Sequence, residues 1–347
     1  MNIVVLCGGL SNERDVSLST GTGAARALLE NGHRVALLDL YLGCPELPDD
    51  MEAAFSFSGD VHGAAVGERL PDLAQLKALR PDSAVRVGPN VLTLCRAADI
   101  VFLALHGEEG ENGKIQAMLD LYGVRYTGSG YLGSALAMNK GLTKTLLRAH
   151  GLAAPEGILL HRGEVPTPGS VRFPCVVKPC SGGSSVGTSI VEGLAAFSTA
   201  LETAFQYEEQ VIVERYIHGR ELTVGVMDGS AMPVIEIIPR RGFYDYRNKY
   251  QPGATEELCP APIGTVATAR AQRIAEQVCA ALQIDAYCRV DLLWDTERDE
   301  MFCLEANTLP GMTPTSLIPR MAAAEGMSYA ALCEKIIAVS MKKYLEA

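Results

Sequence analysis

Two stretches near the C-terminus, YCRVDLLW at 287–294 and EMFCLEA at 300–306, decide the fold of this part of the chain. Both are rich in apolar residues, and five mostly charged residues separate them, so we expect an antiparallel hairpin. Residues two positions apart on a strand share a face. The hairpin therefore gathers an arginine, two carboxylates and an amide in one patch. These are Arg289, Asp291, Glu305 and Asn307.

Oxygen ligands of this kind suit Mg²⁺, which keeps several waters and usually shares its coordination shell with substrate phosphates. Two neighbouring acids would repel each other without a cation. The second strand runs into TLPGMTPTS at 308–316, where backbone N–H groups could stabilise an oxyanion. The alternative is a solvated sheet face whose charges pair without function. The directly following glycine-containing loop favours a metal site.

Two further stretches suit a nucleotide. Lys178 ends a predicted strand and is followed by CSGGSSVG at 180–187, whose small residues let the backbone approach phosphate oxygens. This is not a Walker A loop, because the chain contains no such motif. ERYIHGRE at 214–221 places two acids where they could contact adenine and ribose. An ordinary strand–loop junction has the same appearance.

The rest of the chain predicts an α/β protein followed by α+β parts. Strands at 3–7 and 33–40 with a helix at 16–31 form a β-α-β opening, which favours a parallel, Rossmann-like sheet. Antiparallel hairpins mixed with helices follow. We divide the chain into 1–129, 130–218 and 219–347.

The remaining expected elements complete this outline. The segment 43–90 receives only one helix, near 70–79, and the polar segment 240–257 receives none and is of a length typical of functional loops. The other expected elements are a strand at 100–105, helices at 113–122 and 132–150, strands at 173–178, 188–191 and 211–217, a helix at 193–206, a hairpin at 221–227 and 232–238, a helix at 265–282 and a helix from 327.

Composition excludes several classes of protein. The 347 residues carry a formal charge of −11, which argues against a broad nucleic-acid surface. No apolar run is long enough to span a bilayer, and the first residues do not resemble a signal peptide. The ten cysteines contain no C-x-x-C pair, which fits reduced thiols in the cytoplasm.

Three short motifs suggest other chemistries. GSGYLG at 128–133 fits a dinucleotide-binding turn, but no acidic residue ends a following strand, so a helix-entry turn is the better interpretation. GSSVG at 183–187 fits a nucleophile elbow around Ser185, but the chain continues as a strand and not as a helix. His106 has no second histidine at ligand spacing, and its position after a strand favours substrate contact.

Taken together, the motifs resemble those of the ATP-grasp enzymes, and specifically the D-alanine–D-alanine ligase family. The likeness covers nearly the whole chain and is specific in combination. It comprises CGGLSNERDVS at 7–17, HGEEGENG at 106–113, MNK at 138–140, VVKPCSGGSSVG at 176–187, GFYDYRNKY at 242–250, CRVDLLW at 288–294 and LEANTLPGMTPTSLIP at 304–319.

The resemblance implies a fold and a role for each matching residue. The fold is a preATP-grasp α/β domain followed by two ATP-grasp subdomains, with the phosphate loop in 130–218 and a lid at 240–257. ATP would contact Lys140, Lys178, Ser184, Ser185, Glu214, Ile217, Glu221 and Lys249, and two Mg²⁺, or Mn²⁺ in their place, would bind Asp291, Glu305 and Asn307.

The same resemblance implies the groups around the amino acids. The first D-alanine would contact Glu13, with Val16 and His106 nearby, and Glu13 would form a triad with Ser184 and Tyr250. The tetrahedral intermediate would be stabilised by Arg289 and the Gly311 N–H, and the second carboxylate would be bound at Ser316 and Leu317. The family also implies small-molecule partners only, a cytoplasmic location and a homodimer.

The expected activity is ATP-dependent joining of two D-alanines through a D-alanyl phosphate, for peptidoglycan precursor synthesis. Alternatives are a sibling ligase that makes D-alanyl-D-serine or D-alanyl-D-lactate, or a nucleotide-binding regulator without turnover. Tyr250 and Leu317 match the dipeptide-forming members. Asn112 and Asn139 stand where relatives often carry aspartate, which puts the anchoring of their loops in question.

Overall fold

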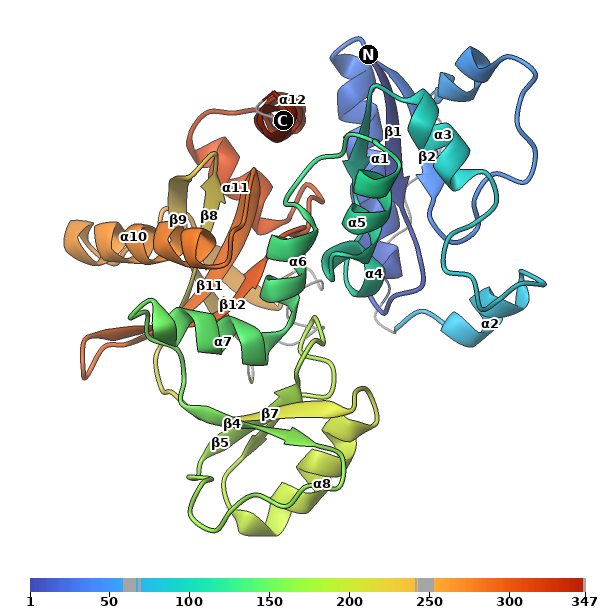
Figure 1. Ribbon diagram of the computed structural model, residues 1–347. Coiled ribbons are helices and arrows are strands. Elements are labelled where there is room, and N and C mark those ends of the chain that lie inside the picture. The colour runs from blue at the N-terminus through green and yellow to red at the C-terminus, as the bar shows by residue number, and fades with distance from the viewer. Residues whose placement is uncertain (59–66, 68–69, 241, 243–252, 346–347) are drawn as a thin grey trace.

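The computed structural model describes residues 1–58, 67, 70–240, 242 and 253–345. Its first layer is a parallel sheet in the order β2-β1-β3, as the β-α-β pattern predicted. Helix α1 packs on β1 and β2 (Figure 1). The bounds are β1 Asn2–Cys7, α1 Arg14–Glu30, β2 Arg34–Asp39 and β3 Ile100–Leu103.

A second, four-stranded sheet lies in the middle of the chain. All its neighbours are antiparallel, in the order β4-β7-β5-β6, and α8 packs against β5, β6 and β7. The predicted strands and helix of this region are present, while β4 was not predicted. The bounds are β4 Gly157–His161, β5 Cys175–Pro179, β6 Ser189–Val191, α8 Leu194–Phe205 and β7 Gln210–Arg215.

The third sheet contains both predicted hairpins. It has five antiparallel strands in the order β10-β9-β8-β11-β12, and α10 lies across one face (Figure 1). Strand β10 takes up the end of the segment in which no element was predicted. The bounds are β8 Arg220–Met227, β9 Ser230–Pro239, β10 Thr255–Leu258, α10 Thr265–Ala281, β11 Tyr287–Asp295 and β12 Glu300–Asn307.

The C-terminal helix α12 returns to the first layer, where it packs against α1. It starts two residues after the predicted position, and α3, α4 and α11 were not predicted. The remaining bounds are η1 Met51–Phe55, α2 Leu73–Ala78, α3 Val91–Ala97, α4 Glu108–Glu111, α5 Lys114–Leu121, α11 Leu317–Ala324, α12 Tyr329–Met341 and η2 Lys342–Tyr344.

The prediction of one helix over 132–150 was wrong, because the chain forms α6 (Tyr131–Met138) and α7 (Lys140–Ala149). Asn139 separates them in an extended conformation, and its Oδ1 accepts a hydrogen bond of 3.0 Å from the Leu142 N–H. An asparagine that caps the second helix favours this break. Asn139 therefore anchors the start of α7 through its own side chain.

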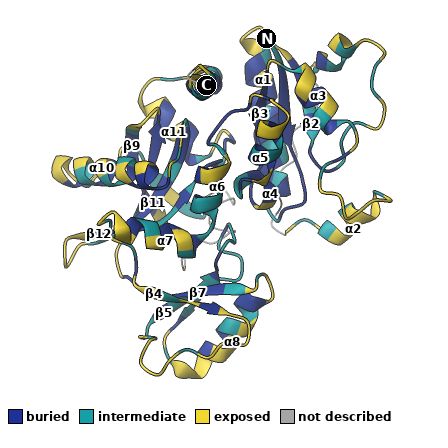
Figure 2. Cartoon of the chain, in the orientation of Figure 1, coloured by how far each residue is buried: buried dark blue, intermediate teal, exposed yellow. Residues whose placement is uncertain are grey.

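Buried residues are concentrated in the strands of the three sheets (Figure 2), and they form three hydrophobic clusters. Each sheet falls within one of the three predicted parts, and those divisions remain a proposal. Helices α6 and α7 contribute Ala137 and Leu147 to the core beneath the third sheet. All ten cysteines are free. None of the described helices combines the length and apolarity that crossing a bilayer requires.

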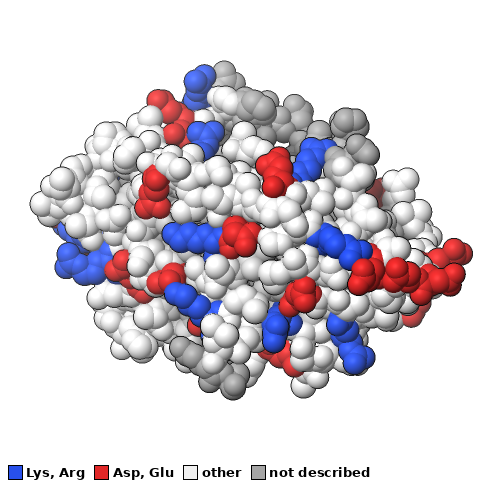
Figure 3. Space-filling model, turned by 90° about the horizontal axis from the view of Figure 1, so that it is seen from above, with Lys and Arg blue, Asp and Glu red and all other residues white. Residues whose placement is uncertain are grey.

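Charge is mixed on the face seen from above (Figure 3). Basic and acidic side chains are interspersed across its middle, and several acidic ones gather at one edge. Among its described residues this face offers no broad basic area of the kind that a phosphate backbone requires.

Candidate active site

A β-bulge in the third sheet decides which residues of β12 face the site. Asp291 is paired with Glu305, but the next residue, Leu292, is paired with Cys303, so Leu304 is an extra residue in β12. Cys303 lies in the core beneath α10. If side chains alternated strictly along β12, Glu305 would point toward that core as Cys303 does. The extra residue reverses the alternation after Leu304. The bulge therefore places Glu305 beside Asp291 on the opposite face.

Asp291 lies at the centre of the predicted patch and is 6% exposed. Its Oδ1 accepts hydrogen bonds from the Thr223 hydroxyl at 2.7 Å and from Arg289 Nε at 2.9 Å. Its Oδ2 accepts from Arg289 at 2.8 Å and from the Asn307 amide at 3.1 Å. The sequence prediction that these side chains share one patch is confirmed.

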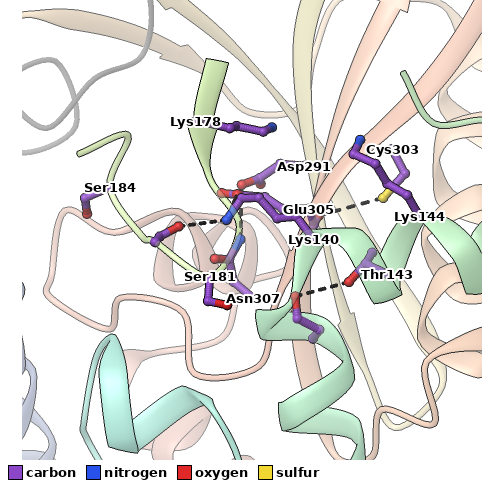
Figure 4. A network of polar contacts seen from close by, with 12 residues as sticks. Lys140, Thr143, Lys144, Lys178, Ser181, Ser184, Asp291, Cys303, Glu305 and Asn307 are labelled. Atoms are coloured by element: carbon purple, nitrogen blue, oxygen red, sulfur yellow. Dashed lines mark hydrogen bonds and ion pairs between the residues drawn. The ribbon is translucent and has the colours of Figure 1, made fainter. Parts of the chain in front are cut away.

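The glycine-serine loop meets this patch through Lys140 (Figure 4). The Lys140 ammonium donates a hydrogen bond of 2.7 Å to the Gly182 carbonyl and lies 3.4 Å from Glu305 Oε2. Its backbone N–H donates to the Cys180 carbonyl at 3.0 Å. Lys140, at the start of α7, therefore connects the glycine-serine loop of the second sheet with Glu305 of the third sheet.

The donor set fits a hard divalent cation. Two carboxylates and one amide supply oxygen atoms, while no group of three His, Cys, Asp or Glu gathers among the described residues. Mg²⁺ is usually bound by one or two carboxylates, with waters and substrate phosphates completing its shell. Asp291, Glu305 and Asn307 therefore suit a cation that a phosphate-bearing ligand helps to bind.

A large cleft of about 1580 Å³, its open mouth included, lies between the second and third sheets. Apolar side chains such as Val176, Ile190 and Leu293 line it together with charged ones. This combination suits a flat base and a polyphosphate. The predicted nucleotide residues on its wall are Lys140, Lys178, Ser185, Glu214, Ile217 and Glu221.

One wall of the cleft carries a buried carboxylate between two lysines. Glu214 Oε2 lies 3.1 Å from Lys178 Nζ, and Glu214 Oε1 lies 3.0 Å from Lys144 Nζ. Burial alone would raise the pKa of Glu214, but the two ammonium groups hold it below its ordinary value. The carboxylate is therefore ionised at neutral pH.

A second, smaller cavity of about 700 Å³ adjoins the acids on the side of the first sheet. Glu13 lies in its wall, and the Ser184 hydroxyl donates a hydrogen bond to Glu13 Oε1. A Cβ at Gly183 would lie only 2.7 Å from Glu13 Oε2, and one at Gly107 2.9 Å from it. Glycine at both positions lets two loops approach the carboxylate.

His106 uses both ring nitrogens to connect the first sheet with the loop after β12. It lies 2.9 Å from the Leu309 carbonyl through Nδ1 and 2.9 Å from the Thr20 hydroxyl through Nε2. The Thr20 oxygen also accepts a hydrogen bond of 3.4 Å from the Met312 N–H. Burial lowers the pKa of His106, so we assign the neutral ring, with the proton on Nδ1. These bonds hold residues 309–312 on both sides of Gly311.

The far end of the small cavity is the start of α11. Ser316 and Leu317 line it beside Gly311, and the Ser316 Oγ accepts a hydrogen bond of 3.0 Å from the Thr313 N–H. Backbone N–H groups at a helix start favour an anionic group. This end of the cavity suits a carboxylate.

The structure thus brings most of the predicted residues to two adjoining cavities. Val16 is an exception, because it is fully buried in α1 and is not among the described residues that line the small cavity. Lys249 and Tyr250 lie outside the described residues. Sequence analysis missed Thr20, Lys144, Thr223 and Glu111. Burial near Glu13 raises the pKa of Glu111 to about 8.

The structure also shows which interpretation holds for each of the three short motifs that suggested other chemistries. Gly130 precedes α6 as a plain helix entry. Ser185 lies in the turn between the antiparallel strands β5 and β6, so the strand–turn–helix geometry of a nucleophile elbow is absent there. Both ring nitrogens of His106 are engaged with protein atoms, which leaves it unsuited to a metal in this conformation.

Comparison with known proteins identifies the family. The model for the D-Ala-D-Ala ligase N-terminus matches residues 2–129, and that for its C-terminus matches 148–338. The chain belongs to the D-alanine–D-alanine ligase family. Together the two matches cover almost the whole chain.

Individual members of this family match along their full length. The D-alanine–D-alanine ligase of Pediococcus pentosaceus is 42% identical, over 100% of this chain and 99% of its own. That of Lacticaseibacillus casei is 39% identical, over 100% and 97%. Among solved structures, the ligase from Bacillus anthracis complexed with ATP has a TM-score of 0.77 and 28% identity, and the match covers 100% of this chain and 99% of that one. The ATP-grasp fold predicted from the sequence is confirmed.

Proposed function

We propose that this ligase joins two D-alanine molecules with ATP and forms D-alanyl-D-alanine, ADP and phosphate. One observation carries the proposal: Glu305 lies in the wall of both the large cleft and the small cavity. The acid pair thus stands where a triphosphate in one cavity meets a carboxylate in the other. The names of the relatives supply the substrate, D-alanine.

The first step transfers the γ-phosphoryl group of ATP to a carboxylate oxygen of the first D-alanine, which gives an acyl phosphate and ADP. Lys140 and Lys178 lie along the cleft and would neutralise phosphate oxygens. Two Mg²⁺ bound to Asp291, Glu305 and Asn307 would offset charge on the transferring group. Glu13, oriented by Ser184, would accept hydrogen bonds from the ammonium of the first amino acid.

In the second step, the amine of the second D-alanine, having lost a proton, attacks the acyl carbon and phosphate leaves. Negative charge collects on the former carbonyl oxygen, where Arg289 and the Gly311 N–H would stabilise it. The start of α11, at Ser316 and Leu317, would bind the carboxylate of the second amino acid. The predicted lid at 240–257 would exclude water from the acyl phosphate, with Lys249 reaching the γ-phosphate and Tyr250 completing the triad with Glu13 and Ser184.

The proposal keeps the finer predictions that come with the family resemblance. These are the homodimer, the cytoplasmic location, the role in peptidoglycan precursor synthesis and the use of Mn²⁺ in place of Mg²⁺. D-Serine and D-lactate remain the competing second substrates, since they differ from D-alanine by few atoms.

ADP release measured across a panel of D-amino and D-hydroxy acids tests the proposed function. We expect release only when ATP, Mg²⁺ and D-alanine are all present, with D-alanyl-D-alanine as the product by mass spectrometry. Omitting each component in turn is the control. Release with D-lactate or D-serine but not with D-alanine alone would favour a sibling ligase, and no release with any acid would favour a regulator.

Thr20→Val removes the hydroxyl between His106 and Met312 and keeps the side-chain shape. We expect kcat to fall by about tenfold, because losing these buried hydrogen bonds lets residues 309–312 shift away from the oxyanion. The KM for ATP should change little. Thr20→Ser should restore most of the rate. Thr22→Val is the matched control, because the Thr22 hydroxyl bonds only within α1, to Leu18. An equal fall in both valine variants would contradict the account of the loop.

A further inference from the structure

Lys144 is a buried lysine that stands behind the large cleft without lining it. Its side chain is 5% exposed, and its Nζ lies 3.0 Å from Glu214 Oε1. Glu214 is 2% exposed, and its other oxygen lies 3.1 Å from Lys178 Nζ. Of these three residues, Glu214 and Lys178 line the cleft, and Lys144 is not among its described lining residues.

Helix α7 accounts for this placement. Lys140 and Lys144 are four residues apart on it and therefore lie on one side of the helix. The first reaches Glu305 and the glycine-serine loop, while the second reaches Glu214 on β7. One helix thus contacts both ends of the cleft wall, and only its first lysine is within reach of a ligand.

The charges of Lys144, Glu214 and Lys178 do not cancel one another. A carboxylate paired with one lysine would form a neutral ion pair, and removing both charges from water would be costly. Here Lys144 and Lys178 share Glu214, and the neighbouring Glu305 is paired with Lys140, so three lysines face two carboxylates and positive charge is in excess. Lys144 does not line the cleft, so Lys178 is the residue that presents the excess positive charge to the ligand.

The pKa values of the two lysines shift in opposite directions. Burial would lower the pKa of Lys178, but Glu214 and Glu305 raise it above its ordinary value. Burial lowers the pKa of Lys144, and Glu214 opposes that effect. Lys178 therefore remains an ammonium group on the cleft wall.

We propose that Lys144 is a positioning residue for the nucleotide: it neutralises Glu214 from behind, so that Lys178 can turn its charge toward the triphosphate. Lys144 touches no substrate and acts through Glu214. Without it, Lys178 would be the one remaining cation of the group, and Glu214 would compete with the phosphates for it. The inference rests on the proposed function and deepens its nucleotide site.

The test measures binding of MgATP to the full-length enzyme by calorimetry, without D-alanine, beside KM values from ADP release. Lys144→Met should weaken ATP binding by about tenfold, within the range of coupling between neighbouring charges. The KM for D-alanine should stay within about twofold, because Lys144 lies away from the small cavity. Lys144→Arg, which keeps the charge, should bind ATP nearly as the wild type does.

The combination with Glu214→Gln separates positioning from a general structural role. Once Glu214 is neutral, it no longer competes with the phosphates for Lys178, while Glu305 acts on Lys178 in both backgrounds, so Lys144→Met should cause little further loss in the double variant. Lys343→Met is the matched control, since Lys343 is a partly buried lysine that lies against Tyr126 and is not among the described residues that line either cavity.

Two results would overturn the inference: unchanged ATP binding in Lys144→Met, or an equal loss whether residue 214 is Glu or Gln. If Lys144→Met does not fold, comparison of Lys144→Arg with Lys144→Gln in the Glu214→Gln background gives the same decision. Wild-type enzyme that binds ATP but does not turn over D-alanine would contradict the proposed function alone.

Discussion

Arg289→Ala is expected to lower kcat by about 10³-fold, because the guanidinium stabilises the charge that develops in the transition state. ATP binding should change by less than about threefold, since Arg289 lies in the wall of the small cavity and not of the cleft. Single-turnover formation of D-alanyl-D-alanine and calorimetry with ATP measure the two quantities separately.

Two further variants sharpen this prediction. Arg289→Lys keeps the charge but loses the two parallel hydrogen bonds to Asp291, so it should restore only part of the rate. Arg270→Ala, which removes a partly buried arginine paired with Asp299 at the far end of the hairpin, should be near wild type. Full activity in Arg289→Ala, or a parallel loss of ATP binding, would contradict the assigned role.

Asp291→Asn is expected to raise the Mg²⁺ concentration for half-maximal activity at least about 100-fold, because a carboxylate ligand becomes a neutral amide. The substitution preserves shape, so folding should be retained and the defect should lie in metal-dependent steps. ADP release over a Mg²⁺ titration at fixed ATP and D-alanine measures it.

The matched control for this variant lies on the same strand. Asp295→Asn changes an aspartate whose carboxylate accepts hydrogen bonds from the turn N–H groups of Glu297 and Arg298. It should leave the Mg²⁺ dependence unchanged. An unaltered Mg²⁺ requirement in Asp291→Asn would show that the acid pair does not bind the cation.

Local patterns predicted most of the sheets. The β-α-β opening and the hairpin at 287–306 follow from continuous apolar runs bounded by turns, and both are present. β4 was missed because its sequence, GILLH, shows no alternation of apolar and polar residues, and at the sheet edge only Leu160 of the five is buried. The start of α11 was missed because Pro319 obscures a helix, although proline is tolerated in the first turn.

The sequence predicts which residues form the site, but it does not predict the contacts that connect them. Sequence spacing placed Arg289, Asp291, Glu305 and Asn307 together, and the structure confirms this. The bulge at Leu304 that sets the phase of Glu305 depends on the pairing of two strands. Likewise, the contact of Lys144 on α7 with Glu214 on β7 joins residues far apart in the sequence, so no local pattern predicts it.

The most direct test of the central claim follows an oxygen atom from D-alanine. Wild-type enzyme would be incubated with MgATP and D-alanine labelled with ¹⁸O in its carboxylate, and the released phosphate would be analysed by mass spectrometry. If the carboxylate is phosphorylated where the two cavities meet, each phosphate released by ligation carries one ¹⁸O atom. Dipeptide formation with unlabelled phosphate would contradict activation through an acyl phosphate.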